Sequence, residues 1–206
     1  MVAGLILASG MSKRFGSNKL SQTLLRHTLL EAVLCSSAGI GLEDIYIVVS
    51  GFTKETLPVF AGRYNIIMNP DPSGGISGSI KISIQMLKGR HDKVLIMLGD
   101  QPLVSRATLR RIISESEMHH DSIICTVSDG VRRNPALFPG RYFKDLQGLN
   151  GDIGANRLLR SEEDVVEVWV NDPDELLDID TPEDLVRARQ IASSNPAWIH
   201  DILDCL

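Results

Sequence analysis

Short runs of hydrophobic residues alternate along this chain with longer segments in which apolar positions recur every three or four residues. Such alternation is typical of an α/β sandwich with a mainly parallel sheet. Six short apolar runs predict six strands, at residues 2–8, 44–50, 65–69, 93–98, 122–127 and 165–170. The run 94–98 is apolar without interruption, which indicates a central strand that is buried on both faces.

Helical signals lie between these runs. Thr28 and Glu31 form a capping box ahead of a predicted helix at 32–38, and the glycine after it can end that helix. Thr181 offers an N-cap hydroxyl and is followed by proline and by two acidic residues, which predicts another helix start. Two more helices are expected at residues 77–87 and 105–118.

No linker divides the chain of 206 residues, which predicts one domain over residues 1–194. Residues 195–206 form a distinct amphipathic tail, with Ile199, Ile202, Leu203 and Leu206 on one helical face. That face predicts a terminal helix packed on its own domain, with a contact to a second copy or a partner as the alternative.

Composition narrows the class of protein. A net charge of −5 provides no general attraction for nucleic acid, so a polyanionic ligand must be met by local cations and metal. No apolar run reaches the ~20 residues that cross a bilayer. The N-terminus has no basic leader or cleavage site, and Cys35, Cys125 and Cys205 are too far apart for a metal motif. We therefore expect a cytoplasmic protein that binds neither membrane nor nucleic acid.

The loop after the first predicted strand carries the strongest chemical signal. It contains Gly10 and Gly16 together with three cations, Lys13, Arg14 and Lys19. Glycines let the backbone approach a ligand, successive peptide N–H groups form an anion-binding concavity, and the cations add whole charges. The spacing differs from the ATPase phosphate loop and from the dinucleotide fingerprint. The loop predicts a triphosphate site, with a solvated glycine-rich turn as the alternative.

Two acidic positions complete the chemical pattern. Asp100 directly follows the buried strand, where ligands of open α/β sheets bind, and its carboxylate can hold Mg²⁺. The alternative is a turn residue ahead of proline. Asp178 and Asp180 flank Ile179 and point the same way if the segment is extended, although either acid could simply cap the following helix.

These residues resemble the nucleotidyltransferases that act on molybdenum cofactor, in particular the cytidylyltransferase branch of the MobA-like family. The resemblance begins with Leu-Ala-Ser-Gly-Met-Ser-Lys-Arg-Phe-Gly-Ser-Asn-Lys at residues 7–19 and departs from the family pattern at Ser9 and Phe15. It continues in order through Asn-Pro-Asp at 69–71, Gly-Asp-Gln-Pro at 99–102, Asn-Pro-Ala-Leu-Phe at 134–138, Gly-Asp-Ile-Gly-Ala at 151–155 and Asp-Ile-Asp-Thr-Pro-Glu-Asp at 178–184.

The resemblance implies a Rossmann-like three-layer sandwich of the nucleotide-diphospho-sugar transferase type and a role for each motif. Lys19 is expected on the α-phosphate, Arg14 on the leaving phosphates, and Asp180 beside Asp100 on Mg²⁺. The nucleoside is expected to contact Leu7, Ala8, Ser9, Gly10, Asn69, Ser77 and Ser79. For the last three residues, a turn with an N-cap serine explains the composition almost as well.

Ser9 also bears on the choice of nucleotide. The guanylyltransferase branch has glycine at this position, and a side chain narrows the space for a purine, which favours CTP over GTP. The family resemblance further assigns a phosphorylated pterin acceptor to Asn134, Gly151, Asp152 and Gly154. Asn156 stands where the family often has arginine, and Arg132, Arg133 and Arg157 are the candidates to replace that cation.

None of the five histidines lies in these motifs, so the sequence offers no convincing general base. A phosphate monoester is already mostly ionised at neutral pH and can attack without losing a proton. The predicted function is Mg²⁺-dependent transfer of CMP from CTP to molybdopterin cofactor, with release of pyrophosphate. The alternatives are transfer from GTP or another NTP to a different phosphorylated acceptor, and an accessory role in delivering cofactor to an apo-molybdoenzyme such as a xanthine dehydrogenase.

Overall fold

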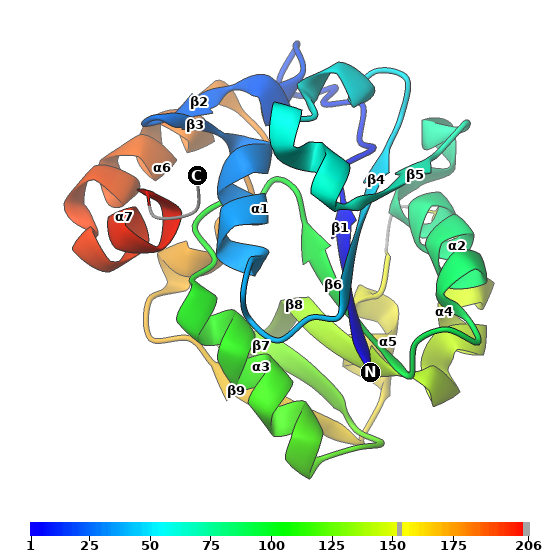
Figure 1. Cartoon of the computed structure of the whole chain (residues 1–206). Helices are drawn as coiled ribbons and strands as arrows, with labels where there is room; N and C mark the ends of the chain where they lie inside the picture. The colour runs from blue at the N-terminus through cyan, green and yellow to red at the C-terminus, as the bar shows by residue number, and fades with distance from the viewer. Residues whose placement is uncertain (152–153, 204–206) are drawn as a thin grey trace.

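The structure, a computed structural model, describes residues 1–151 and 154–203. Its centre is a seven-stranded sheet in the order β5-β4-β1-β6-β8-β7-β9 (Figure 1). All neighbouring strands in it are parallel except β8, which runs antiparallel to both β6 and β7. The strands are β1 Val2–Leu7, β4 Asp44–Val49, β5 Asn65–Met68, β6 Lys93–Leu98, β7 Ile123–Ser128, β8 Val131–Pro139 and β9 Val165–Trp169.

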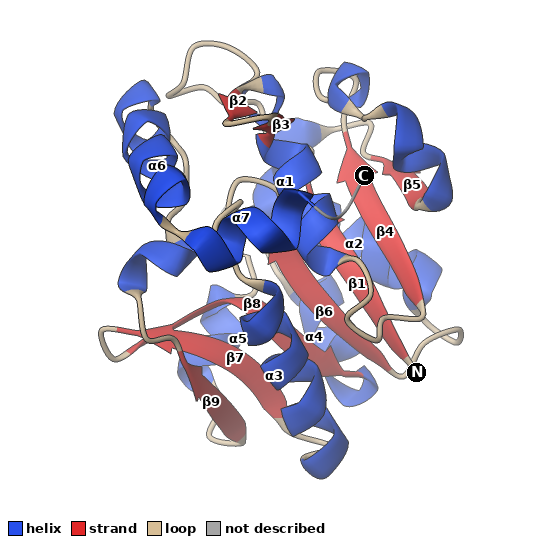
Figure 2. Cartoon of the chain, turned by 60° about the vertical axis from the view of Figure 1, so that its left-hand side comes forward, coloured by secondary structure: helices blue, strands red, loops and turns tan. Residues whose placement is uncertain are grey.

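Helices cover both faces of the sheet, which confirms the predicted three-layer α/β sandwich (Figure 2). They are α1 Leu29–Ser37, α2 Gly75–Leu87, α3 Arg106–Met118, α4 Phe143–Gly148, α5 Asn156–Ser161, α6 Pro182–Ser194 and α7 Pro196–Leu203. A small two-stranded sheet, β2 Thr23–Leu24 with β3 His27–Thr28, leads into α1. In the described part of the chain, no helix is long and apolar enough to cross a bilayer.

The central strand β6 explains how one apolar run serves two cores. Its residues alternate between the faces: Val94 and Ile96 pack with α2, α4 and α5, whereas Leu95 and Met97 pack with α1 and α3. All four are buried, as the uninterrupted apolar run predicts. The hydrophobic effect therefore fixes β6 in the middle of the molecule. The residues that follow β6 lie beyond the carboxyl ends of the central strands, where ligands of open α/β sheets bind.

The predicted capping box at Thr28 is present, and the predicted N-cap Thr181 proves to belong to a capping box as well. The Thr28 hydroxyl accepts from the backbone N–H of Glu31 at the start of α1, and the Glu31 side chain accepts from the backbone N–H of Thr28. Thr181 and Asp184 make the same reciprocal pair at the start of α6. These local bonds satisfy backbone donors that the first turn of a helix leaves unpaired. They fix where α6 begins, and hence where the preceding residue, Asp180, stands.

Three elements of the sandwich were not predicted. Strand β8 contains two prolines, which are rare inside sheets, and the ladder between β7 and β8 shifts between Cys125 and Thr126 to accommodate the extra residues opposite. Helices α4 and α5 are only six residues each and have no side-chain N-cap. Because their signals are weak locally, these elements depend on packing against the sheet.

Helices α6 and α7 form a further cluster outside α1. Trp198 and Ile202 are buried there together with Ile179 and Leu103. The indole N–H of Trp198 donates to the carbonyl of Pro102 over 2.9 Å. The described part of the tail thus packs on its own chain, while Cys205 and Leu206 lie outside the described residues. The division of the chain at residue 194 stays a prediction.

Candidate active site

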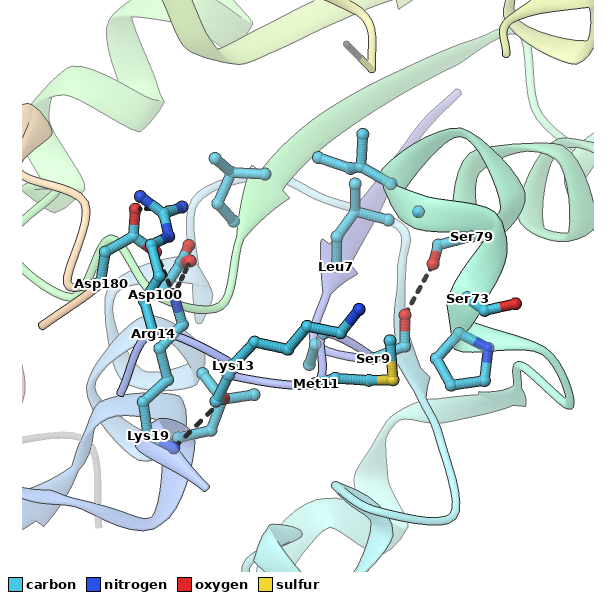
Figure 3. A pocket seen from close by; sticks show the side chains of 18 residues that line it. Leu7, Ser9, Met11, Lys13, Arg14, Lys19, Ser73, Ser79, Asp100 and Asp180 are labelled. Carbon is cyan, nitrogen blue, oxygen red and sulfur yellow. Dashed lines mark hydrogen bonds and ion pairs between the residues drawn. The ribbon is translucent and has the colours of Figure 1, made fainter. Parts of the chain in front are cut away.

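A cleft of about 380 Å³ opens at the carboxyl ends of the central strands β1 and β6. The loop that follows β1 forms its floor, and the start of α2 forms one wall (Figure 3). Its lining residues are Leu7, Ala8, Ser9, Gly10, Met11, Ser12, Lys13, Arg14, Lys19, Leu20, Pro72, Ser73, Gly75, Ile76, Ser79, Leu98, Asp100 and Asp180. The predicted phosphate loop and both predicted metal-binding acids therefore meet in one cavity.

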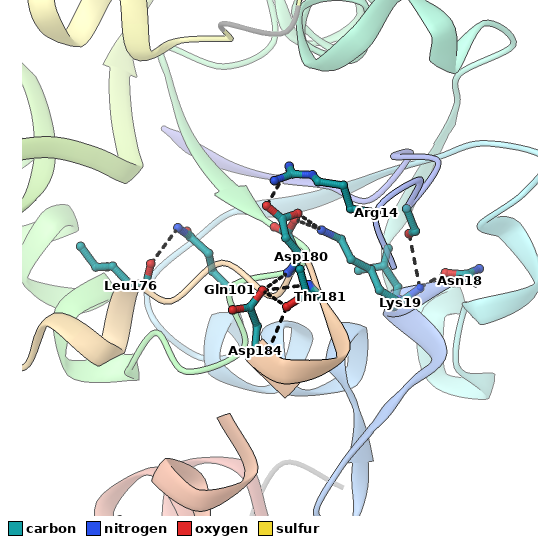
Figure 4. A network of polar contacts seen from close by, with 11 residues as sticks. Arg14, Asn18, Lys19, Gln101, Leu176, Asp180, Thr181 and Asp184 are labelled. Carbon is teal, nitrogen blue, oxygen red and sulfur yellow. Dashed lines mark hydrogen bonds and ion pairs between the residues drawn. The ribbon is translucent and has the colours of Figure 1, made fainter. Parts of the chain in front are cut away.

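Four side chains, Arg14, Lys19, Asp100 and Asp180, form what we call the charged end of the cleft. Lys19 Nζ lies 2.6 Å from Asp100 Oδ2 and 2.8 Å from Asp180 Oδ1. Arg14 Nη2 lies 2.8 Å from Asp180 Oδ2 (Figure 4). The Lys19 side chain is only 10% exposed, whereas the Arg14 side chain is 74% exposed. One cation of this network is thus enclosed and the other faces solvent.

The loop carrying Asp100 lies close against the end of β1. Gly99 donates its N–H to the Leu7 carbonyl, and a Cβ atom at Gly99 would lie 3.1 Å from that same oxygen. Glycine therefore favours this approach of the two segments, because a Cβ atom at this position would push the Leu7 backbone away by a few tenths of an ångström. The approach brings Asp100 beside the first residues of the phosphate loop.

The same loop is also fastened to the C-terminal segment. Ile179 N–H donates to the Asp100 carbonyl over 3.0 Å, and Gln101 Nε2 lies 3.5 Å from the Leu176 carbonyl (Figure 4). The backbone N–H and hydroxyl of Ser105 both donate to the Glu175 carboxylate. These bonds join residues 70 or more positions apart, so they set the spacing between the two acids. Sequence reasoning missed Gln101 because its role depends on these distant partners.

Asp178 adds a third carboxylate near this network. Burial, and then the negative charges of Asp100 and Asp180, raise the pKa of Asp178 to about 6, against an opposing hydrogen bond from Gln101. For Lys19, burial lowers the pKa, but Asp100 and Asp180 outweigh it, so the pKa is raised above its usual value. Lys19 is therefore a permanent cation at neutral pH.

The opposite part of the cleft, which we call the serine end, consists of Ser9, Asn69 and Ser79. The hydroxyls of Ser9 and Ser79 share a hydrogen bond of 2.6 Å, and Asn69 Nδ2 donates to Ser79 Oγ over 3.1 Å. All three residues are buried, and the amide oxygen of Asn69 accepts from the Asp71 N–H. Neutral hydrogen bonds thus connect the phosphate loop, β5 and α2.

Not every residue predicted for the nucleoside lines the cleft. Asn69 supports Ser79 from behind, and Ser77 is buried with its hydroxyl unpartnered among the described residues. Lys13, the third cation of the predicted triphosphate loop, is exposed and lines the cleft between its two ends (Figure 3).

Of the predicted acceptor residues, the three that the structure describes lie outside the cleft lining. Asn134 is buried in β8, and its amide oxygen has no partner among the described residues. A Cβ atom at Gly154 would lie 2.7 Å from Cγ2 of Ile76, a residue that lines the cleft, so Gly154 packs directly behind the wall. Gly151 is exposed, and Asp152 falls outside the described residues.

Arg132, a predicted substitute for the missing cation at position 156, is already engaged. Its guanidinium pairs with Glu167 and donates to the carbonyls of Leu159 and Glu162, so it holds α5 against the sheet. Among the described residues, no group of three or more acidic, histidine or cysteine side chains is arranged to hold a metal ion by itself. The two acids at the charged end therefore supply only part of a coordination shell.

The comparisons with known proteins identify the chain as a nucleotidyltransferase. The MobA-like NTP transferase domain matches residues 4–166, and the chain belongs to that family. It is 28% identical to the purine catabolism protein PucB of Bacillus subtilis, over 92% of this chain and 97% of the relative. It is 26% identical to the molybdenum cofactor cytidylyltransferase of Escherichia coli, over 90% of this chain and 94% of the relative.

A solved structure extends this likeness to three dimensions. The crystal structure of Rv0371c from Mycobacterium tuberculosis superposes with a TM-score of 0.81 at 27% identity, covering 92% of this chain and 97% of that one. A second structure is of the same protein in complex with manganese, with a TM-score of 0.76, 26% identity, and coverage of 92% and 98%. The resemblance read from the sequence motifs is thereby confirmed at the level of family and fold.

Proposed function

We propose that this protein transfers CMP from CTP to the phosphate of molybdopterin cofactor and releases pyrophosphate. The observation that carries the proposal is the charged end, where two cations and two carboxylates from three distant segments meet at the mouth of a phosphate loop. The relative from Escherichia coli, named molybdenum cofactor cytidylyltransferase, supports the choice of substrates. We expect the protein to act in the cytoplasm.

The donor atoms at the charged end fit a magnesium ion. Mg²⁺ prefers oxygen ligands and is commonly held by one or two carboxylates together with substrate phosphates and water. Asp100 and Asp180 present carboxylate oxygens within 2.8 Å of one shared point, the Lys19 ammonium. When bound, the ion would neutralise phosphate charge and polarise the phosphorus–oxygen bonds.

Lys19 and Arg14 are the proposed catalytic cations. A phosphate oxygen of the acceptor attacks the α-phosphorus of CTP, a new P–O bond forms, and the bond to the β-phosphate breaks as pyrophosphate leaves with the electron pair. Lys19 is enclosed beside Asp100, which suits a fixed charge on the α-phosphate. Arg14 is solvent-facing, and its planar fork suits the departing phosphates. The acceptor is already ionised, so no general base is required.

The serine end is the proposed nucleoside pocket. Leu7, Ala8, Ser9 and Gly10 bring the backbone of the phosphate loop along the floor of the cleft, and Ser79 faces it from α2. Ser9 takes up volume that a purine needs, which supports CTP as donor. Asn69 and Ser77 act in this proposal as supports behind the pocket.

The pterin acceptor is proposed to bind around Asn134, Gly151, Asp152 and Gly154. The buried amide oxygen of Asn134 has no partner among the described residues, and a buried acceptor without a donor is costly. Asn134 lies outside the cleft lining, so its place in the acceptor site rests on the family motif. The likeness to a relative named molybdenum cofactor cytidylyltransferase supports this acceptor.

The direct test is pyrophosphate release measured with each of four NTPs and with molybdopterin cofactor, a sugar phosphate and a polyol phosphate as acceptors. We expect release only with CTP and molybdopterin cofactor, and only when Mg²⁺ or Mn²⁺ is present. Preference for GTP would move the protein to the guanylyl branch. Turnover with a sugar phosphate alone would contradict the pterin acceptor.

A second candidate function is delivery of cofactor to an apo-molybdoenzyme, which the likeness to a purine catabolism protein favours. The apolar face of the tail is a poor docking element, because Trp198 and Ile202 are buried within their own chain. Delivery would be supported if preloaded protein activated an apo-molybdoenzyme in the absence of CTP. Activation no faster than with free cofactor would rule it out.

A further inference from the structure

The Lys19 ammonium occupies the position between Asp100 and Asp180 where a divalent cation would bind. Its ammonium contacts Asp100 Oδ2 and Asp180 Oδ1, and the other oxygen of Asp180 contacts Arg14 (Figure 4). Three carboxylate oxygens that face the cleft are thus already paired with protein cations. Lys19 is buried as a residue, so water does not replace these contacts cheaply.

Lys19 and a metal ion cannot share these oxygens. A Mg²⁺ ligated at roughly 2.1 Å by Asp100 Oδ2 or Asp180 Oδ1, the oxygens that Lys19 contacts, would stand close to the ammonium, and like charges at that distance repel strongly. The ammonium lies in ion-pair contact with both carboxylates, and a lysine side chain is a cation at neutral pH. It must move as a cation, and a buried cation moves readily only toward another anion.

Resting on the proposed function, we infer that Lys19 and the divalent cation exchange at Asp100 and Asp180, with the triphosphate as the anion that receives Lys19. The ligand of this site is then the metal–nucleotide complex, and the free ion binds weakly. The remainder of the loop fits this role. Lys13 is exposed on the same loop and makes no ion pair among the described residues, so it adds a further charge for the triphosphate.

The test is a titration of Mn²⁺ followed by its electron paramagnetic resonance signal, in the absence of nucleotide. Wild-type protein and two variants, Lys19→Met and Lys13→Met, are compared. We expect Lys19→Met to bind Mn²⁺ roughly tenfold more tightly than wild type, since it frees both carboxylates. Lys13→Met removes one charge from the same loop without touching the carboxylates, so its Mn²⁺ affinity is expected to match that of wild type.

Equal or weaker Mn²⁺ binding by Lys19→Met would overturn the exchange. A gain of the same size in Lys13→Met would also overturn it, because general electrostatics would then explain the result. Circular dichroism checks that the variants are folded, and Lys19→Gln replaces Lys19→Met if the latter is not. The rise in melting temperature on adding Mn²⁺ is a second readout, expected to be larger in the Lys19 variant than in wild type.

A second titration separates this inference from the proposed function. With CTP present, wild-type protein should bind Mn²⁺ more tightly than without it, and Lys19→Met should show a smaller nucleotide effect. If no nucleotide alters Mn²⁺ affinity in wild type while Lys19→Met still binds more tightly, Lys19 competes with the metal for the carboxylates, but the triphosphate is not the anion that receives Lys19, and nucleotide transfer fails. If nucleotide tightens Mn²⁺ binding equally in both proteins, the exchange fails and nucleotide transfer stands.

Discussion

The charged end of the cleft is partly open to solvent and the serine end is buried, and different forces hold them. At the charged end, Lys19 and Arg14 offset the charges of Asp100 and Asp180 through ion pairs between segments up to 166 residues apart. At the serine end, Ser9, Asn69 and Ser79 are joined by short neutral hydrogen bonds. The comparison teaches that the serine end already has the hydrogen bonds it needs. At the charged end, by contrast, the cations must exchange their carboxylate partners for phosphate oxygens when a polyanion binds.

The difference has a physical origin. Neutral hydrogen bonds between buried groups are lost only at the full cost of leaving a donor or acceptor unsatisfied, so such a network is rigid. An ion pair can be replaced by another ion pair of the same sign pattern, because a phosphate oxygen substitutes for a carboxylate oxygen. We therefore expect variants at the charged end to affect chemistry, and variants at the serine end to affect stability and base choice.

The largest effect is expected from Asp100→Asn. The variant keeps the side-chain shape but removes the carboxylate charge for which Lys19 and the metal compete. Turnover should fall by roughly two orders of magnitude or more. Pyrophosphate release under saturating CTP measures this loss. Asp121→Asn, an exposed acid outside the cleft, is the matched control. Near-normal turnover in Asp100→Asn would remove Asp100 from the mechanism.

Lys19→Ala should lower turnover by a similar factor, roughly a hundredfold, although the metal affinity of the free protein rises. A fall in turnover together with a rise in metal affinity distinguishes a lysine that acts on the phosphates from one that only neutralises the two carboxylates. Single-turnover rates with preformed Mn²⁺–CTP complex measure the chemical step. A turnover loss accompanied by weaker metal binding would instead indicate damage to the carboxylate pair.

An intermediate effect is expected from Trp198→Phe, which tests the frame behind the charged end. The variant keeps an aromatic ring in the cluster but leaves the buried Pro102 carbonyl without its donor. We expect the free energy of unfolding to fall by about 1–3 kcal/mol. Because Pro102 lies two residues after Asp100, Mn²⁺ affinity in the presence of CTP should weaken about threefold.

Asn195→Ala is the control for this variant, since Asn195 caps α7 by accepting from the Trp198 N–H without touching Pro102. It should cost about 1 kcal/mol of stability and leave metal affinity unchanged. Denaturant titration and Mn²⁺ titration measure the two quantities. An equal loss of metal affinity in both variants would show that α7 has no specific effect on the Asp100 loop.

At the serine end, Ser79→Ala should cost about 1–2 kcal/mol of unfolding free energy, because buried Asn69 loses the acceptor for its amide donor. Ser83→Ala, in the same helix, removes only a hydroxyl that donates to the helix backbone, so it is the matched control. The rate of the chemical step should stay within a factor of about three of wild type. A large loss of rate would mean that the serine end takes part in catalysis.

The smallest effect is expected from Ser9→Gly, which tests base choice. Removing the side chain opens space beside the floor of the cleft, and the preference for CTP over GTP should fall by roughly tenfold, or about 1.4 kcal/mol. Competitive binding of the two nucleotides measures the ratio. An unchanged ratio would place base selection elsewhere, with Pro72 and Ser73 on the opposite wall as the next residues to vary.

Much of this architecture is determined locally. The apolar runs correctly place six of the seven strands of the main sheet, and the N-cap signals at Thr28 and Thr181 mark two helix starts, although α1 begins at Leu29 and not at residue 32. Asp100 is visible as a carboxylate after a buried strand, whereas the role expected for Asp180 came from the family resemblance. Signals of this kind depend on the backbone preferences of neighbouring residues, so no tertiary contact is needed to detect them.

The remaining features were decided by tertiary structure alone. Strand β8, with its prolines, belongs to the sheet because β6 and β7 pair with it on both sides. Asn69 stands behind the cleft, and the indole of Trp198 reaches Pro102, because distant segments pack together. The position of Lys19 between both carboxylates joins residues 81 and 161 positions apart, and only the folded chain brings such charges within hydrogen-bonding distance. Sequence thus determined which groups are available, and packing decided which of them are paired.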